Sequence, residues 1–131
     1  MGKIEVEYLG NMLFESKVGN HTVKIDVPDT MGGKDRALTP PQFMLMSLAS
    51  CAAAFAAKYC GTAGLDATGM KVTLDFEKVE GKFTDFKVKV SLPNATDEKR
   101  KQAIFNSVTH CPVKESFEAY KGVDIEIELG R

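Results

Sequence analysis

Apolar and polar residues alternate over two early stretches of the chain, residues 4–8 and 23–27. Because successive side chains of a β-strand point to opposite faces, this alternation predicts strands with one apolar and one solvated face. Asp26 falls on the solvated face of the second stretch. Gly10-Asn11 and Gly19-Asn20 indicate turns in this block, since both residue types tolerate positive φ angles.

A loop from Pro28 to Pro40 leads to a predicted helix from about Pro41 to Cys60, where Ala, Leu and Met predominate. Gly61 follows as a stop signal. The segment is apolar nearly all round, with Lys58 as its only charge, so it is expected at the centre of the structure. Its apolar part is shorter than the roughly 20 residues that span a bilayer, which predicts a buried helix and no membrane span.

Strands return after this helix. Residues 70–77 and 86–92 alternate again, and Glu80-Gly81-Lys82 is the expected hairpin turn between them. The pattern then predicts, in order, a helix over residues 96–110, a short helix over residues 112–120 and a final alternating strand over residues 123–129. This order predicts an α+β fold with a mainly antiparallel sheet whose apolar face the long helix covers.

The composition fits one domain over residues 1–131, with 44% hydrophobic and 27% charged residues. Seventeen basic and eighteen acidic residues nearly cancel, so the overall charge favours neither nucleic acid nor an anionic membrane as partner. The N-terminus lacks an apolar signal core, and three cysteines do not form a disulfide scaffold. A cytoplasmic protein is expected.

Cys51 lies in the middle of the predicted helix, on the face that also holds Leu48 and Phe55. Cys60 is nine residues further on and points to the opposite side, so the two thiols are not expected to act together. Two interpretations of Cys51 stay open, a functional thiol or a buried cysteine that packs as a small hydrophobe. Cys60 is expected in the core or as an exposed thiol at the helix end.

Cys111 immediately precedes Pro112, at the junction between the two shorter predicted helices. A thiol at a helix N-terminus meets unpaired N–H groups and the positive end of the helix dipole, and both favour the thiolate. The alternative is that Cys111 only caps a kink. His110 beside it invites a metal site, but the sequence has no Cys-x-x-Cys pair and no spaced His pair, so no metal is predicted.

Three segments carry a family resemblance: Gly32-Gly33-Lys34-Asp35, the stretch from Pro40-Pro41-Gln42-Phe43 to Cys51, and His110-Cys111-Pro112-Val113. With the order of elements, they resemble the family of osmotically inducible protein C and the organic hydroperoxide resistance protein over nearly the whole chain. The resemblance implies an intertwined homodimer in which the central helices pack together and the sites lie at the subunit interface.

The resemblance also implies a cysteine-based hydroperoxide reductase that defends against oxidative stress. The cysteine matching Cys51 attacks the peroxide as a thiolate and becomes a sulfenic acid, and the cysteine matching Cys111 condenses with it to a disulfide. An external dithiol then reduces the disulfide, so no bound cofactor is expected. A thiol of low pKa and a second thiol that prevents over-oxidation are what this chemistry needs.

The sequence departs from the family pattern at two positions. Hydroperoxide-reducing members carry an Arg near the N-terminal strands that activates the thiolate, held by a Glu at the helix start. No Arg precedes Arg36 here, and Gln42 stands at the helix start, so Arg36 and Gln42 are the auxiliary candidates. A buried thiol without a cation has a raised pKa. The alternatives are therefore a non-peroxidatic dimer that binds a small apolar or thiol-containing ligand at the interface cleft, and a dimer with inert thiols.

Overall fold

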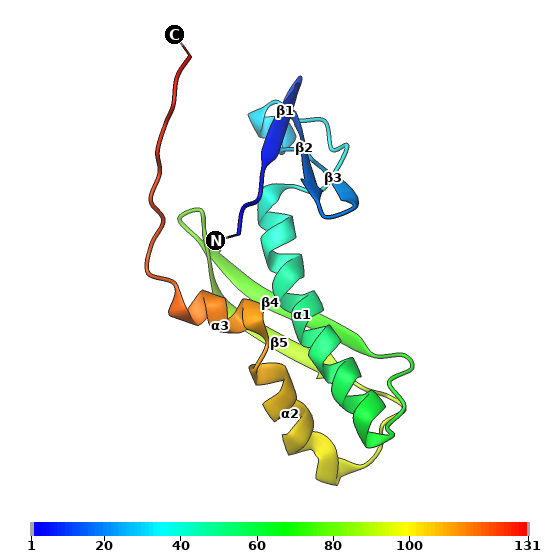
Figure 1. The fold of residues 1–131 in the computed structure, drawn as a ribbon. Coiled ribbons are helices and arrows are strands. Elements are labelled where there is room, and N and C mark those ends of the chain that lie inside the picture. Colours follow the sequence, from blue (N-terminus) through cyan, green and yellow to red (C-terminus); the bar gives the residue numbers. More distant parts are fainter. Residues whose placement is uncertain (1, 131) are drawn as a thin grey trace. The chain divides into compact units, whose positions relative to one another are not determined.

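The computed structural model describes residues 2–130 and shows a mixed α+β chain with antiparallel strands (Figure 1). The α+β fold class is thus confirmed. The chain divides into two compact units, Met1–Ser47 and Leu48–Arg131. The long helix α1, Pro40–Ala63, begins in the first unit and continues into the second.

The first unit holds a three-stranded antiparallel sheet of strands β1 (Val6–Gly10), β2 (Leu13–Val18) and β3 (His21–Ile25), in that order. Two tight hairpins connect them. Asn11 and Met12 both have positive φ in the first turn, a pair of angles that suits the twist of a two-residue hairpin. The sequence predicted both turns of this block but not the strand that joins them, β2.

One face of this sheet is apolar and open. A hollow of about 550 Å³ lies over it, lined by residues of all three strands together with Pro40 and Phe43. Several of its side chains, Val6 among them, are exposed in the chain as described. An apolar sheet face needs a covering layer.

Asp26 departs from its predicted place on a solvated strand face. β3 ends at Ile25, and the Asp26 carboxylate is fully buried. It accepts hydrogen bonds from the backbone N–H of Val27 (2.7 Å) and of Arg36 (3.0 Å) and from the Arg36 guanidinium. The loop packs so closely that a Cβ on Gly33 would overlap the Val27 carbonyl oxygen. A buried charge requires such partners, which strand alternation alone does not reveal.

The predicted long helix is confirmed but extends beyond Cys60 to Ala63. Gly64, with φ of 72°, ends it, and the Leu65 N–H donates to the Cys60 carbonyl (2.8 Å). This is the arrangement in which a left-handed glycine closes a helix. The sequence predicted an apolar segment too short to span a bilayer, but α1 is long and apolar enough to cross a membrane by length and mean hydropathy. Core helices of soluble proteins meet the same two criteria. Its buried residues Leu48, Ala52, Ala56 and Cys60 follow a four-residue spacing along one stripe.

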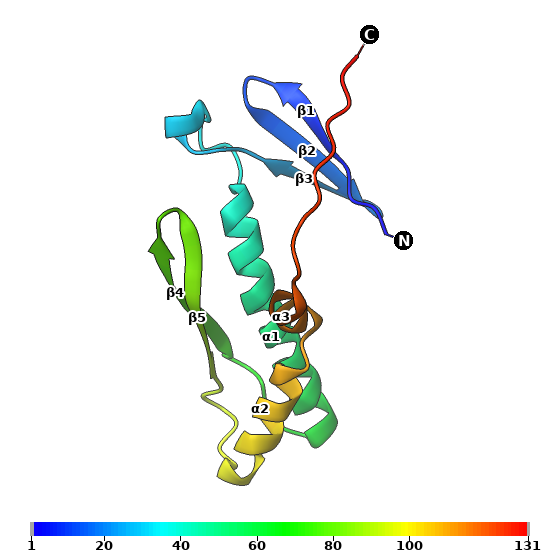
Figure 2. The ribbon, with the colours of Figure 1, turned by 90° about the vertical axis from the view of Figure 1, so that its left-hand side faces the viewer.

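The second unit pairs strands β4 (Lys71–Val79) and β5 (Lys82–Ser91) as an antiparallel hairpin. A short 3₁₀ turn, η2 (Glu98–Arg100), is capped by the Asp97 side chain and leads into α2 (Lys101–Thr109) and α3 (Pro112–Ala119). Figure 2 shows the hairpin along one side of α1 and α2 with α3 along another. The strands therefore form two separate sheets within the described residues, not one.

The predicted final strand over residues 123–129 is wrong for the chain as described. The segment is extended after α3 but pairs with no strand among residues 2–130. Its apolar side chains Val123, Ile125, Ile127 and Leu129 are 70%, 83%, 79% and 84% exposed. Alternation specifies which side chains share a face, but a strand forms only where another edge supplies hydrogen bonds.

Candidate redox site

Cys51 and Cys111 form a disulfide in the structure. They lie 60 residues apart in sequence, and their Cα atoms are 6.0 Å apart, within the usual range for bridged cysteines. Cys51 comes from α1 and Cys111 from the residue that precedes α3, so the bridge joins two helices of the second unit. The helix-junction thiol and the mid-helix thiol therefore share one site.

The two cysteines differ in access. Cys111 is only 1% exposed, whereas Cys51 is partly exposed on the surface of α1. Cys51 is therefore the more solvent-exposed residue of the pair. Accessibility is one of the properties that distinguish a reactive cysteine from a structural one.

The local backbone places Cys111 at the start of α3. Its φ and ψ of −63° and 125° are extended, as expected before Pro112, and the Glu115 N–H donates to its carbonyl (3.0 Å) as in the first turn of a helix. No side chain caps this helix end, and Cys111 is its N-cap residue.

α2 is fastened to α1 by polar contacts that sequence analysis did not find. The Ser107 hydroxyl donates to the Phe55 carbonyl (3.2 Å), and the Arg100 guanidinium donates to the Tyr59 hydroxyl (3.3 Å). Ser107 lies four residues before Cys111, so its bond holds the end of α2 against α1 and brings the two cysteines together. The sequence pattern of α2 indicated only that Ile104 and Val108 share an apolar face, and it gave no sign of these polar contacts.

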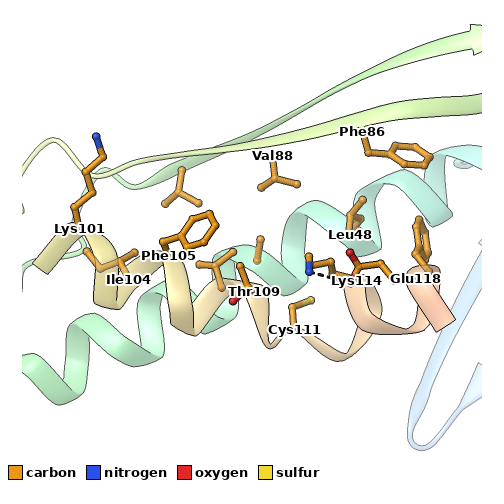
Figure 3. A pocket seen from close by; sticks show the side chains of 14 residues that line it. Leu48, Phe86, Val88, Lys101, Ile104, Phe105, Thr109, Cys111, Lys114 and Glu118 are labelled. Atoms are coloured by element: carbon orange, nitrogen blue, oxygen red, sulfur yellow. Dashed lines mark hydrogen bonds and ion pairs between the residues drawn. The ribbon is translucent and has the colours of Figure 1, made fainter.

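An apolar pocket of about 610 Å³ adjoins the disulfide, enclosed by β5, α1, α2 and α3 (Figure 3). Cys111 forms part of its wall. The Phe86 and Phe117 rings meet edge to face across the pocket, with centroids 5.8 Å apart. Other apolar lining residues are Leu48, Val88, Ile104 and Phe105. Its volume is within the range of small-molecule sites.

Residues 32–128 match the family model described as OsmC-like protein. The chain belongs to the OsmC-like family. No curated protein matches it by sequence. Among solved structures, it is 21% identical to a Psychrobacter arcticus 273-4 protein named for osmotic stress induction and a detoxification response, with a TM-score of 0.76 and 88% of each chain covered.

Two further solved structures carry the name organic hydroperoxide resistance protein. The Elizabethkingia anophelis protein is 18% identical, with a TM-score of 0.58 and 88% of each chain covered. The Legionella pneumophila protein is 16% identical, with a TM-score of 0.53, covering 89% of this chain and 90% of that chain. At these identities the likeness establishes the OsmC-like fold alone.

The two auxiliary candidates of this OsmC-like chain have structural partners in the first unit. The Arg36 guanidinium binds Asp26 (Nε to Oδ2, 2.7 Å) and donates to the Asn11 carbonyl (2.8 Å). The Gln42 side chain accepts a hydrogen bond from the Thr39 N–H (2.9 Å), the reciprocal half of a helix capping box. Their assistance to Cys51 stays a prediction.

Cys60 is a free thiol buried on the α1 stripe, which agrees with the expectation of a core position. His110 lies beside Cys111 but is exposed, with Nδ1 3.9 Å from the Glu115 carboxylate. Within the described residues, no three of His, Cys, Asp and Glu cluster closely enough to hold a metal ion.

Proposed function

We propose that this OsmC-like protein reduces organic hydroperoxides with Cys51 and Cys111. The pairing of these two cysteines across 60 residues is the observation that carries the proposal. Two relatives of the same fold are named organic hydroperoxide resistance proteins, which supports this chemistry for the fold.

Cys51 is the proposed peroxidatic residue because it is the more exposed of the two. Its thiolate sulfur attacks the terminal peroxide oxygen, the O–O bond breaks, and the alkoxide takes up a proton and leaves as an alcohol. Cys51 is then a sulfenic acid. The Cys111 sulfur attacks it, the S–O bond breaks, and hydroxide leaves as water with the Cys111 proton.

The resulting disulfide requires a reductant. We propose an external dithiol. One of its sulfurs attacks the protein disulfide, forms a mixed disulfide and releases one cysteine thiol. Its second sulfur then attacks the mixed disulfide, so the reductant leaves as a cyclic disulfide and the second cysteine thiol is restored. The cycle uses only cysteine sulfur, so it calls for no bound cofactor or metal. A disulfide that must be reduced each turnover suits a reducing compartment such as the cytoplasm.

A homodimer is the proposed assembly. The open apolar sheet face of the first unit and the exposed apolar side chains of residues 123–129 both need a covering surface. A second copy of the chain supplies such a surface, since homodimers of twofold symmetry are the commonest soluble oligomers.

The decisive experiment is a titration of the fully reduced protein with cumene hydroperoxide. The expected result is the loss of two thiols per chain and a Cys51–Cys111 disulfide in peptide mapping. Cys60→Ala is the matched control and should behave as wild type, because Cys60 is a free thiol that takes no part in the bridge, and alanine adds no polar group to the core. Wild-type peroxide consumption by Cys51→Ser would contradict the mechanism.

A second candidate function is ligand binding without peroxidase turnover. Two observations favour it. A pocket lies beside Cys111, and Arg36, the candidate cation for activating the Cys51 thiolate, has its guanidinium bound to Asp26. Negligible peroxide consumption by the reduced wild type, together with a rise in melting temperature on adding an apolar ligand, would decide for it.

A further inference from the structure

The helix α3 has few contacts with the rest of the second unit. It is eight residues long and contains no buried residue, and its side chains Lys114, Phe117 and Glu118 line the pocket instead of a packed core. Lys114 and Glu118 pair with each other inside the helix. Within residues 2–130, α3 makes no side-chain hydrogen bond or ion pair to β5, α1 or α2. A helix of this length is marginal on its own in water, so α3 depends on the few contacts that hold it.

Two contacts hold α3 in place. The Cys51–Cys111 disulfide joins the residue that precedes it to α1. Further along α3, the Phe117 ring meets the Phe86 ring of β5 edge to face, with centroids 5.8 Å apart. After α3, Tyr120 is 65% exposed. The only strong contact of α3 is therefore the disulfide.

The neighbouring helix α2 is held differently. Its Ser107 hydroxyl donates to the Phe55 carbonyl of α1, and the Arg100 guanidinium just before it donates to the Tyr59 hydroxyl. Neither hydrogen bond involves a thiol. The attachment of α2 to α1 is thus independent of the redox state of the cysteines, whereas the attachment of α3 is not.

We infer that the disulfide keeps α3 docked on the second unit, and that reduction of the disulfide releases α3 while α2 stays in place. In the reduction, the S–S bond breaks, and each cysteine sulfur receives one electron and one proton from an external dithiol, which leaves as a cyclic disulfide. Only the aromatic pair then holds α3, and such a pair stabilises the docked state by a factor of about two to ten. The inference goes beyond the proposed peroxidase, because it requires only that the bridge can be reduced, whichever oxidant formed it.

Release of α3 has a measurable consequence for Cys111. With α3 docked, Cys111 is 1% exposed, as closely buried as Cys60 at 0%. Cys60 lies on the buried stripe of α1, which does not depend on α3. If burial in the docked structure alone determined reactivity, the two thiols would react equally slowly. Local opening of α3 should make Cys111 accessible and leave Cys60 protected.

The first test is hydrogen exchange of the oxidised protein and of the protein reduced with dithiothreitol. The backbone amides of residues 115–119 in α3 should exchange at least about tenfold faster after reduction. The amides of residues 105–109 in α2 are the internal control and should exchange at the same rate in both forms. Cys60→Ala keeps the bridge and should show the same rates as wild type in the oxidised form.

The second test is alkylation with iodoacetamide in Cys51→Ala, which cannot form the bridge. Peptide mass spectrometry should find Cys111 modified at least about tenfold faster than Cys60. Adding Phe117→Ala removes the remaining contact and should raise the rate at Cys111 by a factor of about two to ten. Phe105→Ala is the matched control, because Phe105 lines the same pocket but makes no ring contact within the described residues. It should leave the rate at Cys111 unchanged.

Three results would overturn the inference. One is equal exchange of the α3 amides before and after reduction, which would mean that another surface, such as a second copy of the chain, holds α3. Another is equal alkylation of Cys111 and Cys60. The third is an equal effect of Phe117→Ala and Phe105→Ala on the rate at Cys111. No peroxide is present in either test, so a failure of the proposed peroxidase leaves these outcomes unaffected.

Discussion

Asp26 and Arg36 close the loop that precedes the long helix, with the Arg36 Nε atom 2.7 Å from the Asp26 Oδ2 atom. The carboxylate is fully buried and also accepts backbone hydrogen bonds from Val27, Lys34 and Arg36. The hydrogen bond from the Arg36 side chain, followed by these backbone bonds, holds the pKa of the Asp26 carboxyl well below its usual range. One charged pair thus fixes the conformation of residues 26–36.

Asp26→Asn should destabilise the protein. The amide keeps the size of the side chain but leaves Arg36 without its counter-ion and turns one acceptor into a donor that faces N–H groups. The expected result is a melting temperature lower by more than about 5 °C. Asp124→Asn, the same change at an exposed position, should have no effect. A melting temperature equal to that of wild type would show that the loop does not depend on this pair.

The same pair predicts a pH dependence of stability. Because folding lowers the pKa of Asp26, the unfolded chain takes up its proton first as the pH falls, and the stabilisation is complete only above the unfolded value of about 3.9. Wild type should therefore lose stability below this pH, while Asp26→Asn lacks this contribution. The difference between their free energies of unfolding, measured in urea from neutral pH to pH 3, should shrink toward low pH. A constant difference would contradict this explanation.

The sequence predicted elements better than contacts. The composition of residues 41–60 was sufficient for the long helix, and Pro112 marked the start of α3. Alternation could not show that Asp26 is buried, because its partner Arg36 lies in a loop with no periodic pattern. It also could not show which edge residues 123–129 pair with, since register and partner are long-range properties.

For the candidate site too, local patterns predicted the elements but not the contacts between them. Local patterns placed Cys51 in a helix and Cys111 at a helix junction, but only the family resemblance joined them, because 60 residues separate them. The pocket was not predicted at all. Its walls come from β5 and three helices, and no stretch of sequence contains more than part of it.

Cys111→Ser should make Cys51 prone to over-oxidation. Without the resolving thiol, the Cys51 sulfenic acid persists and reacts with further peroxide to sulfinic acid, because the remaining cysteine, Cys60, is buried elsewhere on α1. Mass spectrometry after treatment with excess peroxide should find sulfinic acid on Cys51 in this variant and little in wild type. Cys60→Ala, the control, should form the disulfide normally. If Cys51 of Cys111→Ser stays a free thiol after this treatment, with neither sulfenic nor sulfinic acid on it, Cys51 is not the attacking residue.

Ser107→Ala should slow formation of the disulfide. The substitution removes the hydroxyl that binds the Phe55 carbonyl and holds the end of α2 against α1. We expect a loss of about 1 kcal/mol in stability and a lower rate of disulfide closure in stopped-flow measurements after a peroxide pulse. Ser116→Ala, an exposed serine on α3, serves as the control. An unchanged closure rate would mean that the disulfide partners meet without this contact.

Substitutions in residues 123–129 should separate the proposed dimer. The four apolar side chains of this segment are 70% to 84% exposed, and burying each on a partner contributes about 1.5–3 kcal/mol. Ile125→Lys combined with Ile127→Lys places charges on the apolar side, so light scattering after size exclusion should give the mass of one chain. Asp124→Lys combined with Glu126→Lys introduces the same residue on the polar side and should leave the mass of a dimer. A dimer that survives Ile125→Lys with Ile127→Lys would show that the subunits associate through other surfaces, of which the open sheet face of the first unit is the next to test.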